Sequence, residues 1–194
     1  MTRVAARSSL TATEYLAWER EQRDKHEFHA GEVFAMAGGG PRHNWIAAKV
    51  QSALIRALND RCFTFTSDQR IVFADGARYV YPDASVVCGS VALQDGTSDV
   101  VVNPTILIEV LSSGTEQYDR GLKWEGYQKL PSLTDYLLVA QHEVRVEHVQ
   151  RAVEGSHGRW SYRAYGAGER VTLAGGAQID VDALYERAFE LPGE

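Results

Sequence analysis

The sequence predicts an α/β fold, and two features of its patterning support this prediction. Three segments, 11–24, 42–60 and 116–129, are predicted to be helices, and apolar residues recur at helical spacing in the second of them. The segments around them are rich in β-branched and aromatic residues and are separated by turn-forming residues, a pattern typical of short strands. With 44% hydrophobic and 24% charged residues, the composition is that of a globular protein.

Length and patterning favour a single domain. The 194 residues are enough to bury a sizeable core, and no repeat or low-complexity linker divides them. We expect a flexible N-terminus at 1–10 and one domain at 11–194. No apolar run is long enough to span a membrane, and the first residues lack the apolar stretch of a secretory signal. These features predict a cytoplasmic protein.

The two cysteines, Cys62 and Cys88, lack the spacing of metal ligands and lie in apolar, strand-like segments. We therefore expect both to be buried free thiols in a reducing compartment.

The net charge of −6 argues against a general nucleic-acid binder, because such proteins usually carry a basic surface. It does not exclude a nuclease. The acidic ligands of a metal site add negative charge, and a local basic patch can act within an acidic protein.

The N-terminal third is expected to form a helix and a hairpin. Thr11 or Thr13 is a suitable N-cap for the helix at 11–24, whose apolar face carries Tyr15, Leu16 and Trp18. The hairpin consists of strands at His26–His29 and Glu32–Ala37, joined by a turn at Ala30-Gly31.

The middle of the chain alternates between loops and regular elements. A glycine-rich loop at 38–41, with freedom to move, leads into the helix at about 42–60. The segments that follow are strands within 62–87 with a turn at Asp75-Gly76, a surface loop at 95–103 and the most apolar strand at 104–112.

The C-terminal part begins after Pro131-Ser132, which ends the helix at 116–129. A hairpin is expected at 134–151, with its second strand alternating as a half-exposed edge strand does. This hydrophobic hairpin offers an edge for a homodimer. The remaining elements are strands at 159–166 and 170–175 and a helix at 181–189.

Glu109 is the anomaly in this pattern, because it lies inside the near-continuous apolar run ILIEVL. An ionised carboxylate is costly there unless a positive group compensates it. If the fold brings Asp83 next to it, two carboxylates about 4 Å apart repel by roughly 4 kcal/mol. A hard divalent cation such as Mg²⁺ would resolve both problems, since it is commonly held by one or two carboxylates.

Lys123 and Glu27 complete the candidate site. Lys123 could place a positive charge beside the metal, and Glu27 could add a third acidic group. Each residue also has a simpler interpretation: Glu109 in an ion pair, Asp83 in a turn, Lys123 in a surface i,i+4 pair with Asp119, and Glu27 as an exposed strand carboxylate. His43 is interpreted as a helix cap or surface residue, and Tyr127 as core packing or a phosphate contact.

Eight segments in register resemble one known family. They are EYLAWE, HEFHAGEVFAMAG, HN, TSDQRIVF, YPDASVVCG, ILIEVLS, YDRGLKWEGYQKLPSLTDYLLVAQ and ALYE, which together extend from about Leu10 to Tyr185. This order is similar to that of the Uma family of restriction endonucleases, within the PD-(D/E)XK nuclease superfamily. The resemblance implies a restriction-endonuclease-like α/β (α+β) core, in which a mixed central sheet is flanked by helices.

The resemblance also assigns roles to residues. Asp83 matches the motif aspartate, Glu109 the second acidic position and Glu27 the acidic residue of the leading motif. Leu111 stands where an E-x-K motif has lysine, and Lys123 matches a lysine that has moved to the following helix. Asp83, Glu109 and Glu27 are thus expected to bind Mg²⁺ or Mn²⁺, and Lys123 to assist catalysis.

The resulting hypothesis is a metal-dependent endonuclease that hydrolyses phosphodiester bonds of DNA as a homodimer. One alternative is a catalytically inactive dimeric binding or regulatory module on the same fold, favoured by the net charge and the missing E-x-K lysine. Another is a metal-dependent hydrolase of small phosphoesters.

Overall fold

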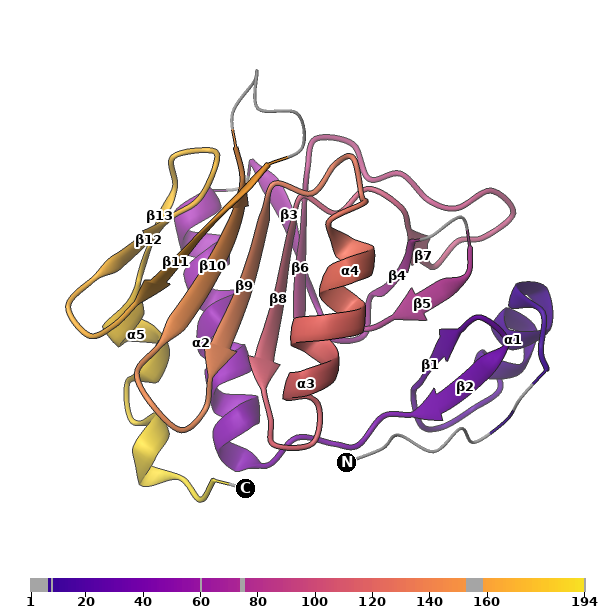
Figure 1. Cartoon of the computed structure of the whole chain (residues 1–194), viewed down its shortest axis with the longest axis horizontal. Coiled ribbons are helices and arrows are strands. Elements are labelled where there is room, and N and C mark those ends of the chain that lie inside the picture. Colours follow the sequence, from indigo (N-terminus) through magenta and orange to yellow (C-terminus); the bar gives the residue numbers. More distant parts are fainter. Residues whose placement is uncertain (1–6, 8, 60, 74–75, 153–158, 194) are drawn as a thin grey trace.

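Two mixed β-sheets face each other in this computed structural model, which describes residues 7, 9–59, 61–73, 76–152 and 159–193 (Figure 1). The larger sheet has the order β11-β10-β9-β8-β6-β3, and the smaller has the order β2-β1-β5-β4-β7. The larger sheet is built from β3 (Cys62–Thr66), β6 (Ala84–Cys88), β8 (Ile106–Leu111), β9 (Asp135–Ala140), β10 (Val146–Arg151) and β11 (Trp160–Tyr165). The smaller is built from β1 (His26–His29), β2 (Glu32–Ala35), β4 (Arg70–Phe73), β5 (Arg78–Val80) and β7 (Val100–Val101).

Helices cover both faces of the larger sheet. On one side lie α2 (Pro41–Leu58), α5 (Val181–Tyr185) and a 3₁₀ turn (Ala188–Glu190), beside a ribbon of β12 (Arg170–Thr172) and β13 (Gln178–Asp180). On the other side lies one continuous helical segment: α3 (Glu116–Tyr118), a π-helical turn (Asp119–Lys123) and α4 (Trp124–Tyr127). The mixed sheet flanked by helices is the architecture that the sequence predicts.

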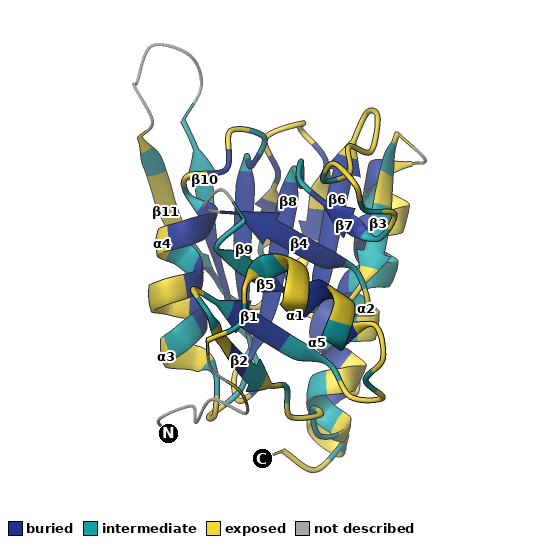
Figure 2. Cartoon of the chain, turned by 90° about the vertical axis from the view of Figure 1, so that its right-hand side faces the viewer, coloured by how far each residue is buried: buried dark blue, intermediate teal, exposed yellow. Residues whose placement is uncertain are grey.

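Three apolar clusters hold these layers together. The first lies between α2 and the larger sheet, and the second between that sheet, α4 and the inner side of the smaller sheet. The third packs α1 (Ala12–Glu19) on the outer side of the smaller sheet. Figure 2 shows the strands largely buried, while the outer surfaces of the helices are exposed. A side chain between the two sheets is therefore far from solvent unless a pocket reaches it.

The N-terminal elements follow their local signals. Thr11 caps α1 in a capping box with Glu14, and the turn residues Ala30 and Gly31 both have positive φ, as a type I′ hairpin turn requires. The helix is shorter than expected, because it ends at Glu19 rather than Asp24. Residues 1–6 and 8 of the expected flexible N-terminus, and Asp75 of the expected turn, lie outside the described residues, and the single domain stays a prediction.

Two expectations about strands are wrong. The second strand of the 134–151 hairpin, β10, is an interior strand, because β11 pairs with it along its whole length. The surface loop at 95–103 contains β7, whose Val100 and Val101 are buried and pair with β4. The described edges of the larger sheet are β11 and β3. The homodimer stays a prediction and loses the hairpin edge that suggested it.

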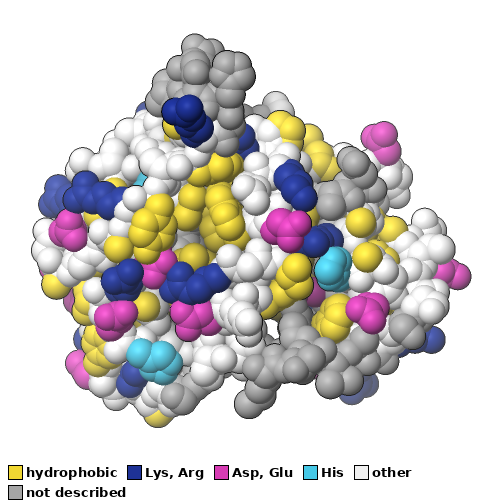
Figure 3. All heavy atoms as spheres, viewed as in Figure 1, with side chains coloured by type: hydrophobic (Ala, Val, Ile, Leu, Met, Phe, Trp, Pro, Cys, Tyr) yellow, Lys and Arg dark blue, Asp and Glu magenta, His cyan; other side chains and the backbone are white. Residues whose placement is uncertain are grey.

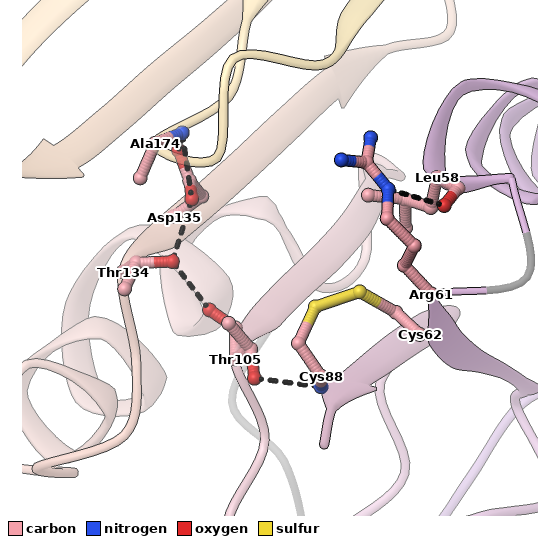
Figure 4. The surroundings of a disulfide bond; sticks show 8 residues. All are labelled: Leu58, Arg61, Cys62, Cys88, Thr105, Thr134, Asp135 and Ala174. Carbon is pink, nitrogen blue, oxygen red and sulfur yellow. Dashed lines mark hydrogen bonds between the residues drawn. A yellow bond between two sulfur atoms is a disulfide. The ribbon is translucent and has the colours of Figure 1, made fainter.

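The expectation of two buried free thiols is also wrong, because Cys62 and Cys88 form a disulfide (Figure 4). The two residues are directly opposite each other in the antiparallel pair β3–β6, with Cα atoms 4.2 Å apart. Cys62 is half-buried and Cys88 is exposed. In the described residues no helix has the length and apolarity to cross a bilayer. The cytoplasmic location stays a prediction, without the free thiols that favoured it.

We expect the Cys62→Ser/Cys88→Ser double variant to be less stable than the oxidised protein. The disulfide closes a loop with a sequence separation of 26 residues, which corresponds to about 2 to 4 kcal/mol of unfolding free energy. Urea unfolding of both proteins measures the difference. Dithiothreitol should lower the stability of the wild type and leave the variant unchanged. Two titratable thiols in the unreduced, unfolded wild type would contradict the disulfide.

Candidate active site

Strand geometry directs the predicted acidic residues into the space between the two sheets. In β8 the side chains of Leu107 and Leu111 belong to the cluster beneath α4, and Glu109 lies between them on the same face because side chains alternate along a strand. In β1, Phe28 packs on α1, so Glu27 points the opposite way, toward the larger sheet. The two glutamates come from different sheets and face one space.

Lys123 lies at the centre of this space. Its Nζ atom is 2.9 Å from Glu109 Oε1, 3.1 Å from Asp119 Oδ1 and 3.3 Å from Glu27 Oε1. Only 6% of the lysine side chain is exposed. Burial favours the neutral amine, but Asp119, Glu109 and Glu27 outweigh it, so the pKa of Lys123 lies well above its ordinary value. The ammonium is charged and joins three carboxyl groups from three elements.

Glu109 is buried and accepts two hydrogen bonds on Oε1. Lys123 Nζ donates one, and Tyr127 Oη donates the other over 3.0 Å. Burial raises the pKa of Glu109, Lys123 opposes this, and Asp119 and Asp83 raise the pKa further; the net result is a pKa well above the usual carboxyl range. Four carboxyl groups and one ammonium leave the cluster with an excess of acid, which a proton or a cation must balance.

Asp83 is held against the strand that carries Glu109. Its Oδ2 accepts the backbone N–H of Val110 over 2.7 Å, and its Oδ1 lies 3.2 Å from Nε2 of His43. The Asp83 side chain is 19% exposed, which makes it the most exposed of the four carboxyl groups in the cluster. It forms the solvent-facing part of the cluster.

A pocket of about 470 Å³ opens onto the cluster. Its wall includes all four acids, Lys123 and His43, together with the glycine loop at 38–39 and the turn at 112–115. A Cβ atom on Gly39 would lie 2.4 Å from Cδ2 of His43, so this glycine is required for close packing against the imidazole. The glycine loop that the sequence suggests is mobile is thus part of the pocket wall.

The donor set fits a hard divalent cation. In the described part of the chain, no three or more His, Cys, Asp or Glu side chains are grouped closely enough to hold a metal by themselves. A magnesium site does not require this, because Mg²⁺ is usually bound by one or two carboxylates and completes its shell with water and substrate oxygens. Asp83 and Glu109 supply two carboxyl groups to one pocket, and the excess of acid favours a cation there.

Two residues belong to this site that the sequence interpretation assigned elsewhere. Asp119 is buried, so the i,i+4 pair with Lys123 exists but is not a surface pair. His43 contacts Asp83 instead of serving as a cap or surface residue. Tyr127 packs in the core, one of the two interpretations given for it, and its hydroxyl also donates to Glu109. The spacing of Asp119 and Lys123 was a visible signal. For His43, no local pattern reveals a contact made across 40 residues.

The π-helical turn is fixed to the sheet by an arginine. Arg120 donates to both carboxylate oxygens of Glu147 in β10, over 2.7 and 2.9 Å. Arg120 lowers the pKa of Glu147 most, Arg145 contributes as well, and together they bring it to about 2. Asp119 and Lys123 lie in the same turn as Arg120, so the ion pair between Arg120 and Glu147 helps to hold Asp119 and Lys123 over Glu109. Single π-turns within α-helices often occur at functional sites.

Comparisons with known proteins agree with this architecture. A family model described as "Putative restriction endonuclease", Uma2, matches residues 12–184. Two proteins of Synechocystis sp. (strain ATCC 27184 / PCC 6803 / Kazusa) are similar: "Uncharacterized protein slr1290", 34% identical over 91% of both chains, and "Uncharacterized protein sll1609", 36% identical over 76% of this chain and 84% of its own.

Among solved structures, a "putative nuclease belonging to DUF820" from Anabaena variabilis ATCC 29413 superposes with a TM-score of 0.70. It covers 92% of this chain and 99% of its own at 16% identity, so it supports the fold alone.

We expect Lys123→Met to destabilise the protein by about 3 to 5 kcal/mol at neutral pH, because it leaves buried carboxyl groups without their cation. Lys129→Met is the matched control. Lys129 pairs with Glu125 on the surface of the same helical segment, and its loss should cost less than about 0.5 kcal/mol. Urea unfolding measures both. Equal effects would contradict a central role for Lys123.

We expect Glu147→Gln to lower stability at neutral pH by about 1 to 3 kcal/mol. Because the folded state holds the pKa of Glu147 at about 2, below its ordinary value of 4.5, the stabilisation is present above pH 4.5 and is lost as the pH falls toward 2. The unfolding free energies of variant and wild type should therefore converge as the pH falls from about 4.5 toward 2. The exposed Glu125→Gln serves as the control; a gap between Glu147→Gln and wild type that is as large near pH 2 as at pH 7 would disprove the ion pair's contribution.

Proposed function

The chain belongs to the Uma2 family, described as "Putative restriction endonuclease", and on this premise we propose that it is a divalent-metal-dependent endonuclease that hydrolyses phosphodiester bonds of DNA. The observation that carries the proposal is the gathering of Asp83, Glu109, Glu27 and Lys123 around one pocket. These residues come from distant parts of the chain. Burying so many ionisable groups lowers the stability of the fold, and such clusters in a pocket are typical of functional sites.

In this proposal Asp83 and Glu109 hold Mg²⁺ or Mn²⁺, and Glu27 provides a further carboxylate. When bound, the cation lowers the pKa of a water molecule and polarises a phosphoryl oxygen. The Val110 N–H keeps Asp83 in place by binding one carboxylate oxygen, and Tyr127 does the same for Glu109. Both hydrogen bonds orient ligands before substrate arrives, which is how outer groups usually support a metal site.

Lys123 has two tasks in the proposed enzyme. Without substrate, its ammonium compensates Glu27, Glu109 and Asp119 and allows the acids to be buried together. With substrate, the same ammonium stabilises the negative charge that develops on the phosphate. Lys123 lies in the helical segment that follows β8. In this proposal it takes the role of the lysine of an E-x-K motif, because Leu111 occupies that lysine's position in the strand.

The inactive binding module is the second candidate, and one observation favours it. Lys123 already pairs with three carboxyl groups, so the site is partly neutralised without a metal. The two candidates differ in what they require of Asp83. An enzyme needs Asp83 to bind the cation, whereas a module that is held together by Lys123 alone does not.

We expect Asp83→Asn to weaken Mn²⁺ binding by roughly tenfold or more, since even the loss of an outer-shell partner costs a metal site that much. Isothermal titration calorimetry with Mn²⁺ and Mg²⁺ measures the affinity. Asp68→Asn is the control, because Asp68 is an exposed surface carboxylate paired with Lys25. Equal binding by wild type and Asp83→Asn would end the metal proposal.

Plasmid nicking with Mg²⁺ or Mn²⁺ tests activity on the same proteins. Asp83→Asn and Lys123→Met should each lower the nicking rate by roughly a hundredfold or more. Metal binding with no nicking of any nucleic acid would favour the inactive module instead.

A further inference from the structure

His43 and Asp83 present two donor atoms of different kinds to the same pocket. Nε2 of His43 lies 3.2 Å from Oδ1 of Asp83, and both residues line the pocket of about 470 Å³ that also includes Glu109. The side chains of His43 and Asp83 are 13% and 19% exposed, so both are held within the wall and both can be reached by solvent. A ligand in this pocket can meet an imidazole nitrogen and a carboxylate oxygen together.

Helix periodicity explains why the imidazole lies there. His43 is in the first turn of α2, on the same face as Ile46 and Val50, which pack against the larger sheet. That face directs His43 toward the start of β6, where Asp83 immediately precedes the strand. Gly39 packs so closely on the ring that a Cβ atom would not fit. The position of the imidazole is therefore fixed by the backbone on two sides.

The two oxygens of Asp83 are not equivalent. Oδ2 accepts the backbone N–H of Val110 over 2.7 Å, whereas Oδ1 faces Nε2 of His43. A cation that binds Oδ1 would replace the hydrogen bond to His43 and come within reach of Nε2. Neighbouring donor atoms around an octahedral ion with bonds of about 2.1 Å are roughly 3 Å apart. The distance between Nε2 and Oδ1 is close to that separation.

We propose that His43 is a metal ligand together with Asp83, so that the site binds a first-row transition-metal ion such as Co²⁺ or Mn²⁺ in preference to Mg²⁺. The inference rests on the proposed nuclease function, because it concerns the cation of that site. Mg²⁺ is held mainly by carboxylates, water and phosphate oxygens, whereas an imidazole nitrogen favours transition-metal ions. The carboxylates of Asp83 and Glu109 accept either kind of ion, and the nitrogen of His43 distinguishes them.

Charge alone does not provide this selectivity, because Mg²⁺, Mn²⁺ and Co²⁺ are all divalent. The net charge of −6 attracts each of them equally at long range. The face in Figure 3 shows acidic and basic side chains interspersed instead of one large surface of either sign. The choice between these ions therefore depends on the donor atoms that line the pocket.

Isothermal titration calorimetry with Co²⁺ and Mg²⁺ tests the proposal without any catalytic readout. We expect His43→Gln to weaken Co²⁺ binding by roughly tenfold or more and to change Mg²⁺ binding much less. Glutamine keeps an N–H group that can donate to Asp83, so a role limited to that hydrogen bond would leave the affinity for both ions nearly unchanged. His142→Gln is the matched control, because His142 is exposed and does not line the pocket.

Pulsed electron paramagnetic resonance of bound Mn²⁺ identifies the donor atom directly. A coordinated imidazole adds a ¹⁴N modulation to the Mn²⁺ signal, and this modulation should change when the histidines are labelled with ¹⁵N. We expect it in the wild type and in His142→Gln and not in His43→Gln. The labelled wild type alone shows whether a histidine is bound, so this measurement does not require a stable variant.

The outcomes separate this inference from the nuclease proposal. Mn²⁺ binding that is weakened by Asp83→Asn but shows no histidine modulation would overturn His43 as a ligand and leave the metal-dependent nuclease intact. A modulation that survives in His43→Gln, or equal Co²⁺ affinities of His43→Gln and wild type, would also overturn it. A modulation that depends on His43, without cleavage of any nucleic acid, would support the ligand and overturn the nuclease. Failure of the wild type to bind Mn²⁺ or Co²⁺ would overturn both.

Discussion

One buried ammonium group determines how this fold is assembled around its site. Lys123 contacts Glu27 of the smaller sheet, Glu109 of the larger sheet and Asp119 of its own helical segment. Burying these acids in their ionised form is costly without a positive partner. The three contacts of Lys123 therefore join the two sheets and the helical segment at one place. The excess of acid that remains makes the site receptive to a divalent cation.

Backbone geometry explains why these groups converge. The two-residue alternation of β8 sends Glu109 to the same face as Leu107 and Leu111, away from the α2 side. The hydrogen bond from the Val110 N–H then fixes Asp83 next to the same strand. The distances that create a candidate active site follow from strand pairing, and only the final contacts depend on long, flexible side chains.

The sequence predicts features that depend on neighbouring residues and misses those that depend on distant ones. Thr11, the Ala30-Gly31 turn and the anomalous Glu109 are visible because each signal is local. The Cys62–Cys88 disulfide, the strand that covers β10 and the contact of His43 with Asp83 depend on register between segments far apart in the chain. Hydrophobic periodicity reports which face of an element is buried but not which element covers it. The burial of Glu109 suggests Asp83 as its partner, and the resemblance to a family supports that pairing, because spacing alone does not establish a contact between them.

The disulfide at the edge of the larger sheet has a consequence for catalytic geometry. A strand that slips by one residue turns every side chain to the opposite face. The covalent link fixes Cys62 opposite Cys88, and Cys88 ends the strand that begins just after Asp83. A one-residue shift of β6 within the sheet would turn Asp83 toward α2 and away from Glu109. Pairing with β8 on one side of β6 sets this register, and the disulfide to β3 on the other side adds a covalent link at the far end of β6 from Asp83.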